Sequence, residues 1–247
     1  MSVLKPYFAE IRAELLKTFR QPGFVAPSLL FPVCFYLIFG ILMPHRGEFD
    51  AASWFFASYG AFGVIGPALF GFGAAMAVER EAGWLDLKQV APMPVGAALI
   101  SKMVMSLVFA VIIFVLLSLL AVTVGGVRMP ASSWLASGVV LVFGTLPFCA
   151  LGLVIGAYAR ARSAAGVVNL VYLPMSALSG LWFPLFLMPA AVQKVALLMP
   201  AYHLGQLNFI ATGHASGGWM MHVLALIAFS VIFMALAARG LSRSERR

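Results

Sequence analysis

The chain has 247 residues, of which 63% are hydrophobic and only 10% are charged, and its mean hydropathy is +1.02. A soluble domain is nearer half apolar, so this composition excludes an ordinary soluble globular protein and favours an integral membrane protein. The net charge of +8 would by itself be compatible with nucleic-acid binding, but its distribution along the chain argues against that partner.

A short amphipathic helix is expected at residues 4–20. Its apolar residues recur at spacings of three and four, and they are Leu4, Phe8, Ile11, Leu15 and Phe19. The charged residues of the segment fall largely away from this stripe, which predicts a helix lying along a membrane interface. A soluble helix packed on a partner is the alternative, but a membrane span follows at once after Gln21-Pro22-Gly23, which favours the interface.

Six long uncharged intervals separate the charged residues of the chain. Each is long enough for a helix that crosses a hydrocarbon core of about 30 Å. They predict an all-α integral membrane protein, formed by a single domain over residues 1–247, with spans near 24–43, 54–78, 98–124, 134–158, 166–187 and 220–239.

The basic residues predict the orientation of these spans. With the N-terminus inside, the inner segments hold thirteen lysines and arginines, and the outer loops hold only Arg46, Arg128 and Lys194. This bias predicts a multi-pass protein of a cell membrane with both termini in the cytoplasm. The positive charge then serves topology and contact with anionic membrane lipids, and no nucleic-acid partner is expected.

A compact charged segment, EREAGWLDLKQVAPMPVGAALISK at residues 79–102, separates the second and third spans. Its three acidic and three basic residues cancel, whereas a loop that served only topology would be basic. Apolar residues are interleaved among the charges, and Pro92 and Pro94 follow. The pattern predicts a short cytoplasmic helix near 79–91 that presents a surface to another protein; a solvated run of charges is the alternative.

A broken apolar segment follows the fifth span, at residues 179–207. Pro184, Pro189 and Pro200 interrupt it, and Lys194 is its only charge. It predicts a re-entrant or interfacial helical hairpin on the outer side, over residues 183–205. We expect an outer gate in which Trp182 and Phe183 close the mouth of a path while Pro184 and Pro189 fix the bends. A passive cap that anchors the fifth and sixth spans is the alternative.

Motifs of common active sites are absent from the sequence. There is no G-x-x-x-x-G-K-[ST] phosphate loop, no H-E-x-x-H zinc helix and no G-x-S-x-G nucleophile turn, and no acidic residue lies inside a predicted span. We therefore expect no catalytic residue and no metal site. Asn169, Tyr172 and Ser176 are candidates to line a substrate path, although hydrogen bonds between helices would also explain them. The glycines of the second span predict close helix packing.

The sequence resembles the membrane subunit of ABC-2-type transporters. The first matching pattern is E-R-E-x-G-x-L-x-L with a later proline and lysine, carried by Glu79, Arg80, Glu81, Gly83, Leu85, Leu87, Pro92 and Lys102. The second is the broken outer segment, carried by Ser179, Gly180, Phe183, Pro184, Pro189, Pro200 and Tyr202. Where this chain has Trp84, the family usually has a small polar residue.

The resemblance implies a permease subunit of an ATP-driven exporter in a bacterial inner membrane. It implies a separate cytoplasmic ATPase in two copies, which holds ATP and magnesium, and a second permease subunit that is expected to be identical. This chain is expected to bind no cofactor itself. The helix that enters the ATPase is expected to use Glu79, Arg80, Glu81, Gly83, Trp84, Leu85, Leu87 and Lys88.

Two other functions are compatible with six spans. A channel or secondary carrier is the first alternative, but a carrier is expected to show intramembrane charges or an internal repeat. An intramembrane enzyme is the second, but no paired catalytic groups stand out. The scarcity of polar residues on the spans suggests a lipid-like, amphipathic or glycan cargo rather than a bare ion.

Overall fold

The computed structural model describes residues 4–43, 50–84, 94 and 96–244, and every regular element in these ranges is a helix. In chain order they are α1 (Leu4–Phe19), α2 (Pro22–Phe35), the π-helix η1 (Tyr36–Leu42), α3 (Ala51–Leu69), the π-helix η2 (Phe70–Ala74), α4 (Ala75–Glu81), α6 (Ala97–Thr123), α7 (Ala131–Phe143), α8 (Leu146–Tyr158), α9 (Ala161–Leu178), the 3-10 helix η3 (Leu185–Leu187), α10 (Ala190–Ala196), α11 (Pro200–Ala211) and α12 (Trp219–Ser244). The all-α prediction is confirmed.

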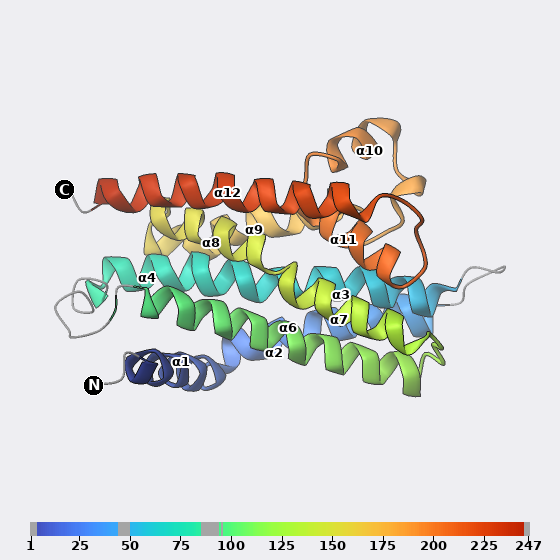
Figure 1. The fold of residues 1–247 in the computed structure, drawn as a ribbon, viewed down its shortest axis with the longest axis horizontal. Coiled ribbons are helices and arrows are strands. Elements are labelled where there is room, and N and C mark those ends of the chain that lie inside the picture. The colour runs from blue at the N-terminus through green and yellow to red at the C-terminus, as the bar shows by residue number, and fades with distance from the viewer. Residues whose placement is uncertain (1–3, 44–49, 85–93, 95, 245–247) are drawn as a thin grey trace.

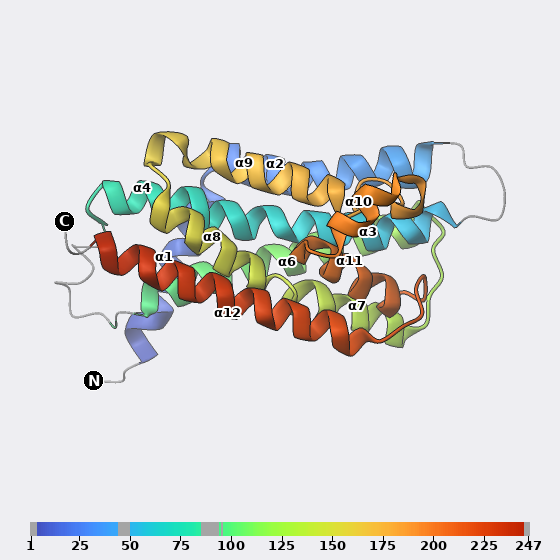
Figure 2. The ribbon, with the colours of Figure 1, turned by 90° about the horizontal axis from the view of Figure 1, so that it is seen from above.

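The long helices run side by side along one axis, as Figures 1 and 2 show. Helix α1 and the last turns of α12 lie at the same end of this bundle, which we call the α1 end, and α10 lies at the opposite end, which we call the α10 end (Figure 1). Figure 2 shows α1 running across the axis of the long helices. An N-terminal helix that lies across the spans is what the amphipathic pattern predicts.

Five helical segments are long and apolar enough to cross a membrane. They are Pro22–Leu42, Ala51–Glu81, Ala97–Thr123, Ala131–Tyr158 and Trp219–Ser242. These match five of the six expected spans closely, because uninterrupted apolar sequence defines them. The fourth is bent, since α7 ends at Phe143 and α8 begins at Leu146.

The sixth expected span, 166–187, corresponds to α9, which is not among the five. Arg162 and Asn169 make this helix less apolar than its neighbours. The expected end at residue 187 is wrong, because the helix ends at Leu178 and the chain turns at Gly180, whose φ of 77° suits glycine. The count of six spans stays a prediction.

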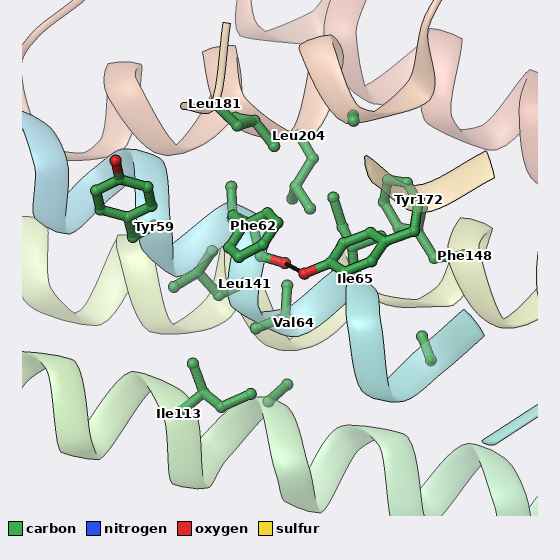
Figure 3. Close-up of a cluster of buried hydrophobic side chains, with 14 of the residues drawn as sticks. Tyr59, Phe62, Val64, Ile65, Ile113, Leu141, Phe148, Tyr172, Leu181 and Leu204 are labelled. Atoms are coloured by element: carbon green, nitrogen blue, oxygen red, sulfur yellow. Dashed lines mark hydrogen bonds between the residues drawn. The ribbon is translucent and has the colours of Figure 1, made fainter. Parts of the chain in front are cut away.

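The segment formed by α3, η2 and α4 is the centre of the bundle. All but one of the 19 residues of α3 are buried, and α3 contacts α2, α6, α7, α8, α9 and α11. Figure 3 shows the packing around α3, where Phe62, Val64 and Ile65 meet side chains from α6, α7, α9 and α11. Van der Waals packing of this kind holds membrane helices together, since lipid offers no hydrophobic driving force between them.

Glycines allow α8 to cross the central segment at very short range. A Cβ atom on Gly156 would lie 2.6 Å from the carbonyl oxygen of Phe72, and one on Gly152 would lie 3.0 Å from the carbonyl oxygen of Ala68. On the central segment itself, a Cβ atom on Gly73 would lie 2.8 Å from Val168 of α9, and one on Gly63 would lie 2.8 Å from Pro32 of α2. These contacts confirm the expectation that the glycines of the second span serve close helix packing.

The broken apolar segment forms three short helices, η3, α10 and α11. Pro184 and Pro189 immediately precede η3 and α10, and Pro200 is the first residue of α11. The prolines therefore divide the segment as expected. Re-entry into the membrane stays a prediction. The segment extends beyond the expected end at residue 205, because α11 continues to Ala211 and packs against α3, α7 and α12.

Candidate coupling site

Four charged side chains from three helices meet at the α1 end of the bundle. We call Glu14 and Lys17 of α1, Glu79 of α4 and Lys102 of α6 the charge cluster. The Lys102 Nζ atom donates to Glu14 Oε1 at 2.8 Å and to Glu79 Oε1 at 3.0 Å. The Lys17 Nζ atom donates to Glu14 Oε2 at 3.1 Å and also to Glu79 Oε1. The cluster ties α1 to the end of α4 and to the first turns of α6.

The charge cluster is balanced, and three of its four members are buried, whereas Lys17 is exposed. The side chain of Lys102 is 1% exposed, and Glu14 and Glu79 are also buried. An ammonium group can be buried at this level only when carboxylates compensate the lost hydration. Burial opposes protonation of Lys17, but the carboxylates of Glu79 and Glu14 outweigh it and raise the pKa of Lys17 above its ordinary value. Lys17 is therefore charged at neutral pH.

Arg80 holds the end of α4 from another side. Its guanidinium donates to the carbonyl oxygen of Ala159 at 2.8 Å and to that of Ala157. Both carbonyls belong to the C-terminal end of α8, where a positive charge is favourable. In the last turn of α4, Glu79 thus contacts α1 and α6, and the next residue, Arg80, contacts the end of α8.

The residues predicted to contact an ATPase divide into three groups. Glu79 and Arg80 turn toward their own chain, as described above. Glu81 and Trp84 are exposed, Trp84 to 56%, and Gly83 between them has a φ of 71° that ends the helix. Leu85, Leu87 and Lys88 lie outside the described residues. Contact of this segment with a partner stays a prediction, and Trp84 is the most exposed apolar group among its described residues.

The predicted path residues lie on α9 near α2 and α3. Tyr172 is buried, stacks on Phe62 with ring centroids 5.0 Å apart, and donates a hydrogen bond of 3.0 Å to the carbonyl oxygen of Phe62 (Figure 3). Asn169 is exposed, and Ser176 is fully buried. Asn169 and Tyr172 both line a groove of about 450 Å³ between α2, α3 and α9.

The predicted gate residues lie at the α10 end of this groove. Trp182 lines it and packs near Phe35, while Phe183 is half-exposed and meets Phe39 edge-on. The backbone of the turn is anchored on α3, because the hydroxyl of Tyr59 donates to the carbonyl oxygen of Trp182 at 3.2 Å. Pro184 is buried and Pro189 is exposed. A gating role for these residues stays a prediction.

Two histidines pair at the α10 end. His203 of α11 and His222 of α12 approach with 2.9 Å between their Nδ1 atoms, and His203 Nε2 lies 3.0 Å from the carbonyl oxygen of Leu197. That carbonyl requires a proton on Nε2, so neutral His203 accepts at Nδ1 and His222 donates. Burial lowers the pKa of His203 despite the bond to Leu197. Within the described ranges, no group of three or more histidine, cysteine or acidic side chains could hold a metal ion.

Two residues that connect distant helices, Glu14 and Asn208, are not indicated by the sequence pattern. Glu14 was assigned only to the polar face of the N-terminal helix, and nothing in its spacing indicates a partner 88 residues away. Asn208 of α11 is fully buried, accepts from Ser137 Oγ at 2.8 Å and donates to the carbonyl oxygen of Ala57 at 2.8 Å. The available signal was an amide side chain set between the apolar residues Leu207 and Phe209.

Comparison with known proteins decides the family. The ABC-2 type transporter model matches residues 6–207, which extend from α1 to α11 and include the whole charge cluster. The chain belongs to the ABC-2 type transporter family. It is also 29% identical over 228 residues to "Putative transport permease YvfS" of Bacillus subtilis (strain 168), covering 91% of this chain and 92% of that protein.

Membership confirms the resemblance that the two motifs indicated. It makes this ABC-2 family member a multi-pass membrane protein and a transport permease rather than an enzyme. The family model spans both regions that carried the resemblance, the charged segment after the second span and most of the broken segment after the fifth.

Proposed function

We propose that this permease is the membrane subunit of an ATP-driven exporter and that a separate ATPase docks beside the charge cluster. The observation that supports the proposal is the exposure of Glu81, the last residue of α4, and of Trp84 just beyond it. Through Glu79 and Arg80, this end of α4 is bonded to α1, α6 and α8. The sequence contains no phosphate-binding loop of its own, so ATP and magnesium belong to the partner.

The charge cluster then serves to transmit movement. A push on the segment after α4 reaches α1 and α6 through Glu79, and it reaches α8 through Arg80. Because α3, η2 and α4 form one continuous helical segment, the same push acts on the centre of the bundle. ATP binding can shift the spans only if the two access states hold this segment differently.

Replacing Trp84 with alanine tests the docking surface. We expect the Trp84→Ala variant to fold normally, because the side chain is exposed, and to lose about tenfold in affinity for the ATPase, as is usual for a tryptophan at the centre of an interface. Trp219→Ala is the matched control, since Trp219 is 54% exposed but begins α12 at the other end of the bundle. Equal ATPase retention by both variants in co-purification would contradict the proposed surface.

The α1 end of the bundle faces the cytoplasm in this proposal. The basic residues of the sequence gather at the predicted inner segments, and α1 presents exposed apolar side chains such as Phe8 beside its charges. In a variant without Cys34 and Cys149, a cysteine at position 214 should react with a membrane-impermeant thiol reagent added outside sealed cells. A cysteine at position 81 should stay unreacted, and the reverse pattern would overturn the orientation.

A second copy of the chain is proposed to cover the face formed by α2 and α9. This face carries Asn169, Ser28 and a groove, whereas α12 presents large aliphatic residues such as Ile227 and Val231 that suit lipid. Two grooves would then face each other, and their aromatic lining suits an amphipathic, lipid-like or glycan cargo.

Trp182 and Phe183 are proposed to gate the path formed by these grooves. If they do, replacing both residues with alanine should change the export rate per assembled complex.

A further inference from the structure

Two neighbouring residues of α3 hold the turn that follows α9. The hydroxyl of Ser58 donates to the carbonyl oxygen of Leu181 at 2.7 Å, and the hydroxyl of Tyr59 donates to the carbonyl oxygen of Trp182 at 3.2 Å. Ser58, Tyr59 and Leu181 are fully buried. Within the described ranges, neither carbonyl accepts any other hydrogen bond.

The backbone of this turn is bonded to two different helices. Its N–H groups turn back to α9, where the N–H of Leu181 donates to the carbonyl oxygen of Ser176 at 3.1 Å. Its carbonyl groups turn to α3. A buried carbonyl needs a donor, and an irregular turn has no helical partner that could supply one. The hydroxyls of Ser58 and Tyr59 therefore attach the turn to α3.

The ring of Tyr59 also packs on the same side chains as the predicted gate residues. The ring centroids of Tyr59 and Trp182 lie 5.7 and 6.1 Å from that of Phe35. Those of Tyr59 and Phe183 lie 6.2 and 5.7 Å from that of Phe39. Aromatic contacts at these distances add to the hydrogen bond. The position of Tyr59 thus fixes both the backbone of the turn and the packing of its side chains.

The helix that carries Ser58 and Tyr59 continues to the charge cluster. Helices α3, η2 and α4 follow one another without a break, and Tyr59 precedes Glu79 by 20 residues. At about 1.5 Å per residue, this length is about 30 Å. The central segment is therefore bonded to the turn near one end and to the charge cluster at the other.

We propose that Ser58 and Tyr59 are positioning residues, which make the turn that bears Trp182 and Phe183 follow α3. The inference rests on the proposed function for the source of the movement, which is the ATPase at the α1 end. Without nucleotide, the two hydrogen bonds hold the turn against α3. When α3 shifts, the turn shifts with it and the α10 end of the groove changes shape. A purely structural pair would stabilise the turn without linking its movement to nucleotide.

A cysteine at the buried position 181 reports release of the turn. In the purified full-length chain without Cys34 and Cys149, Leu181→Cys should react slowly with a water-soluble maleimide. Adding Tyr59→Phe should accelerate the reaction about fivefold, the ratio that corresponds to one lost hydrogen bond. An unchanged rate would overturn the positioning role. If Leu181→Cys does not fold, hydrogen exchange of residues 179–183 in the Tyr59→Phe chain gives the same comparison.

Two controls make this rate specific to the turn. Leu187→Cys, at a position that is 70% exposed, should react rapidly with or without Tyr59→Phe, which shows that the reagent itself is not limiting. Tyr158→Phe removes another tyrosine hydroxyl, one that donates to the carbonyl oxygen of Leu236 at 3.3 Å. Because Tyr158 ends α8 at the α1 end, this variant should leave the rate at position 181 unchanged, and an equal acceleration would overturn the proposal.

Nucleotide separates a positioning role from a purely structural one. In the complex with the ATPase, a non-hydrolysable ATP analogue should change the labelling rate of Leu181→Cys. In the same complex with Ser58→Ala and Tyr59→Phe, ATP hydrolysis should continue, but the labelling rate should no longer respond to the analogue. A response of the same size in that variant would overturn the inference. If the complex with natural Ser58 and Tyr59 shows no response, the proposed ATP-driven gate fails, and the nucleotide-free rates still decide whether these residues position the turn.

Discussion

Lys102→Met is expected to destabilise the protein by about 3–5 kcal/mol, the usual cost of removing one partner from a buried ion pair. The side chain of Lys102 is 1% exposed, and its ammonium lies 2.8 Å from Glu14 and 3.0 Å from Glu79. Methionine fills a similar volume, so the loss reflects charge rather than packing. With Lys102 removed, Lys17 alone faces two buried carboxylates. The measurement is the thermal or denaturant unfolding of the purified chain, together with its yield from membranes.

Two controls separate this effect from a general effect of losing a positive charge. Lys5→Met removes an exposed lysine from α1 and should change stability by less than about 0.5 kcal/mol. Combining Lys102→Met with Glu14→Gln and Glu79→Gln should restore much of the lost stability, because no uncompensated buried carboxylate then remains. A triple variant that is less stable than Lys102→Met alone would contradict the electrostatic explanation.

Gly156→Ala is expected to be a second severely destabilising substitution. Its new Cβ atom would lie 2.6 Å from the carbonyl oxygen of Phe72, and backbone atoms cannot rotate away as a side chain would. Overpacking of this kind costs about 1–3 kcal/mol and sometimes more. The expected result is a loss of folded protein after solubilisation, seen by size-exclusion chromatography and by a lower unfolding midpoint.

Gly166→Ala is the matched control for this crossing. Gly166 lies on α9, where an added Cβ atom meets open space within 4 Å. Because alanine is favoured over glycine inside a helix, this variant should be as stable as the natural chain or more stable. Equal stability of the two alanine variants would show that the α8 crossing is looser than the structure indicates.

Much of the architecture follows from the charge-free intervals of the sequence. The boundaries of the second and third spans were expected at 54–78 and 98–124, and the helices run over Ala51–Glu81 and Ala97–Thr123. The length of an uninterrupted apolar stretch determines which residues can cross a membrane, and this length can be read directly from the sequence. The same reasoning placed the end of the fifth span too late, because residues 179–187 stay apolar although the chain has already turned at Gly180.

The candidate site was predicted only in part. The sequence indicated that Glu79 and Arg80 matter, but it suggested that they face a partner, whereas the structure directs both toward their own chain. Periodicity describes which face of one helix is polar; it does not say which distant helix meets that face. For this reason Glu14 and Asn208 could not be paired with Lys102 and Ala57 from the sequence alone.

The central claim is that this permease works with a separate ATP-hydrolysing subunit docked at the α1 end of the bundle. The most direct measurement is purification of the tagged chain from its native membrane, with its partners identified by mass spectrometry and ATP hydrolysis assayed. We predict that the chain alone hydrolyses no ATP, and that it co-purifies in equal amount with a subunit that contains a phosphate-binding loop. We also predict that Trp84→Ala loses that subunit while Trp219→Ala retains it. Robust ATP hydrolysis by the isolated chain, or an intact complex with no such subunit, would contradict the account.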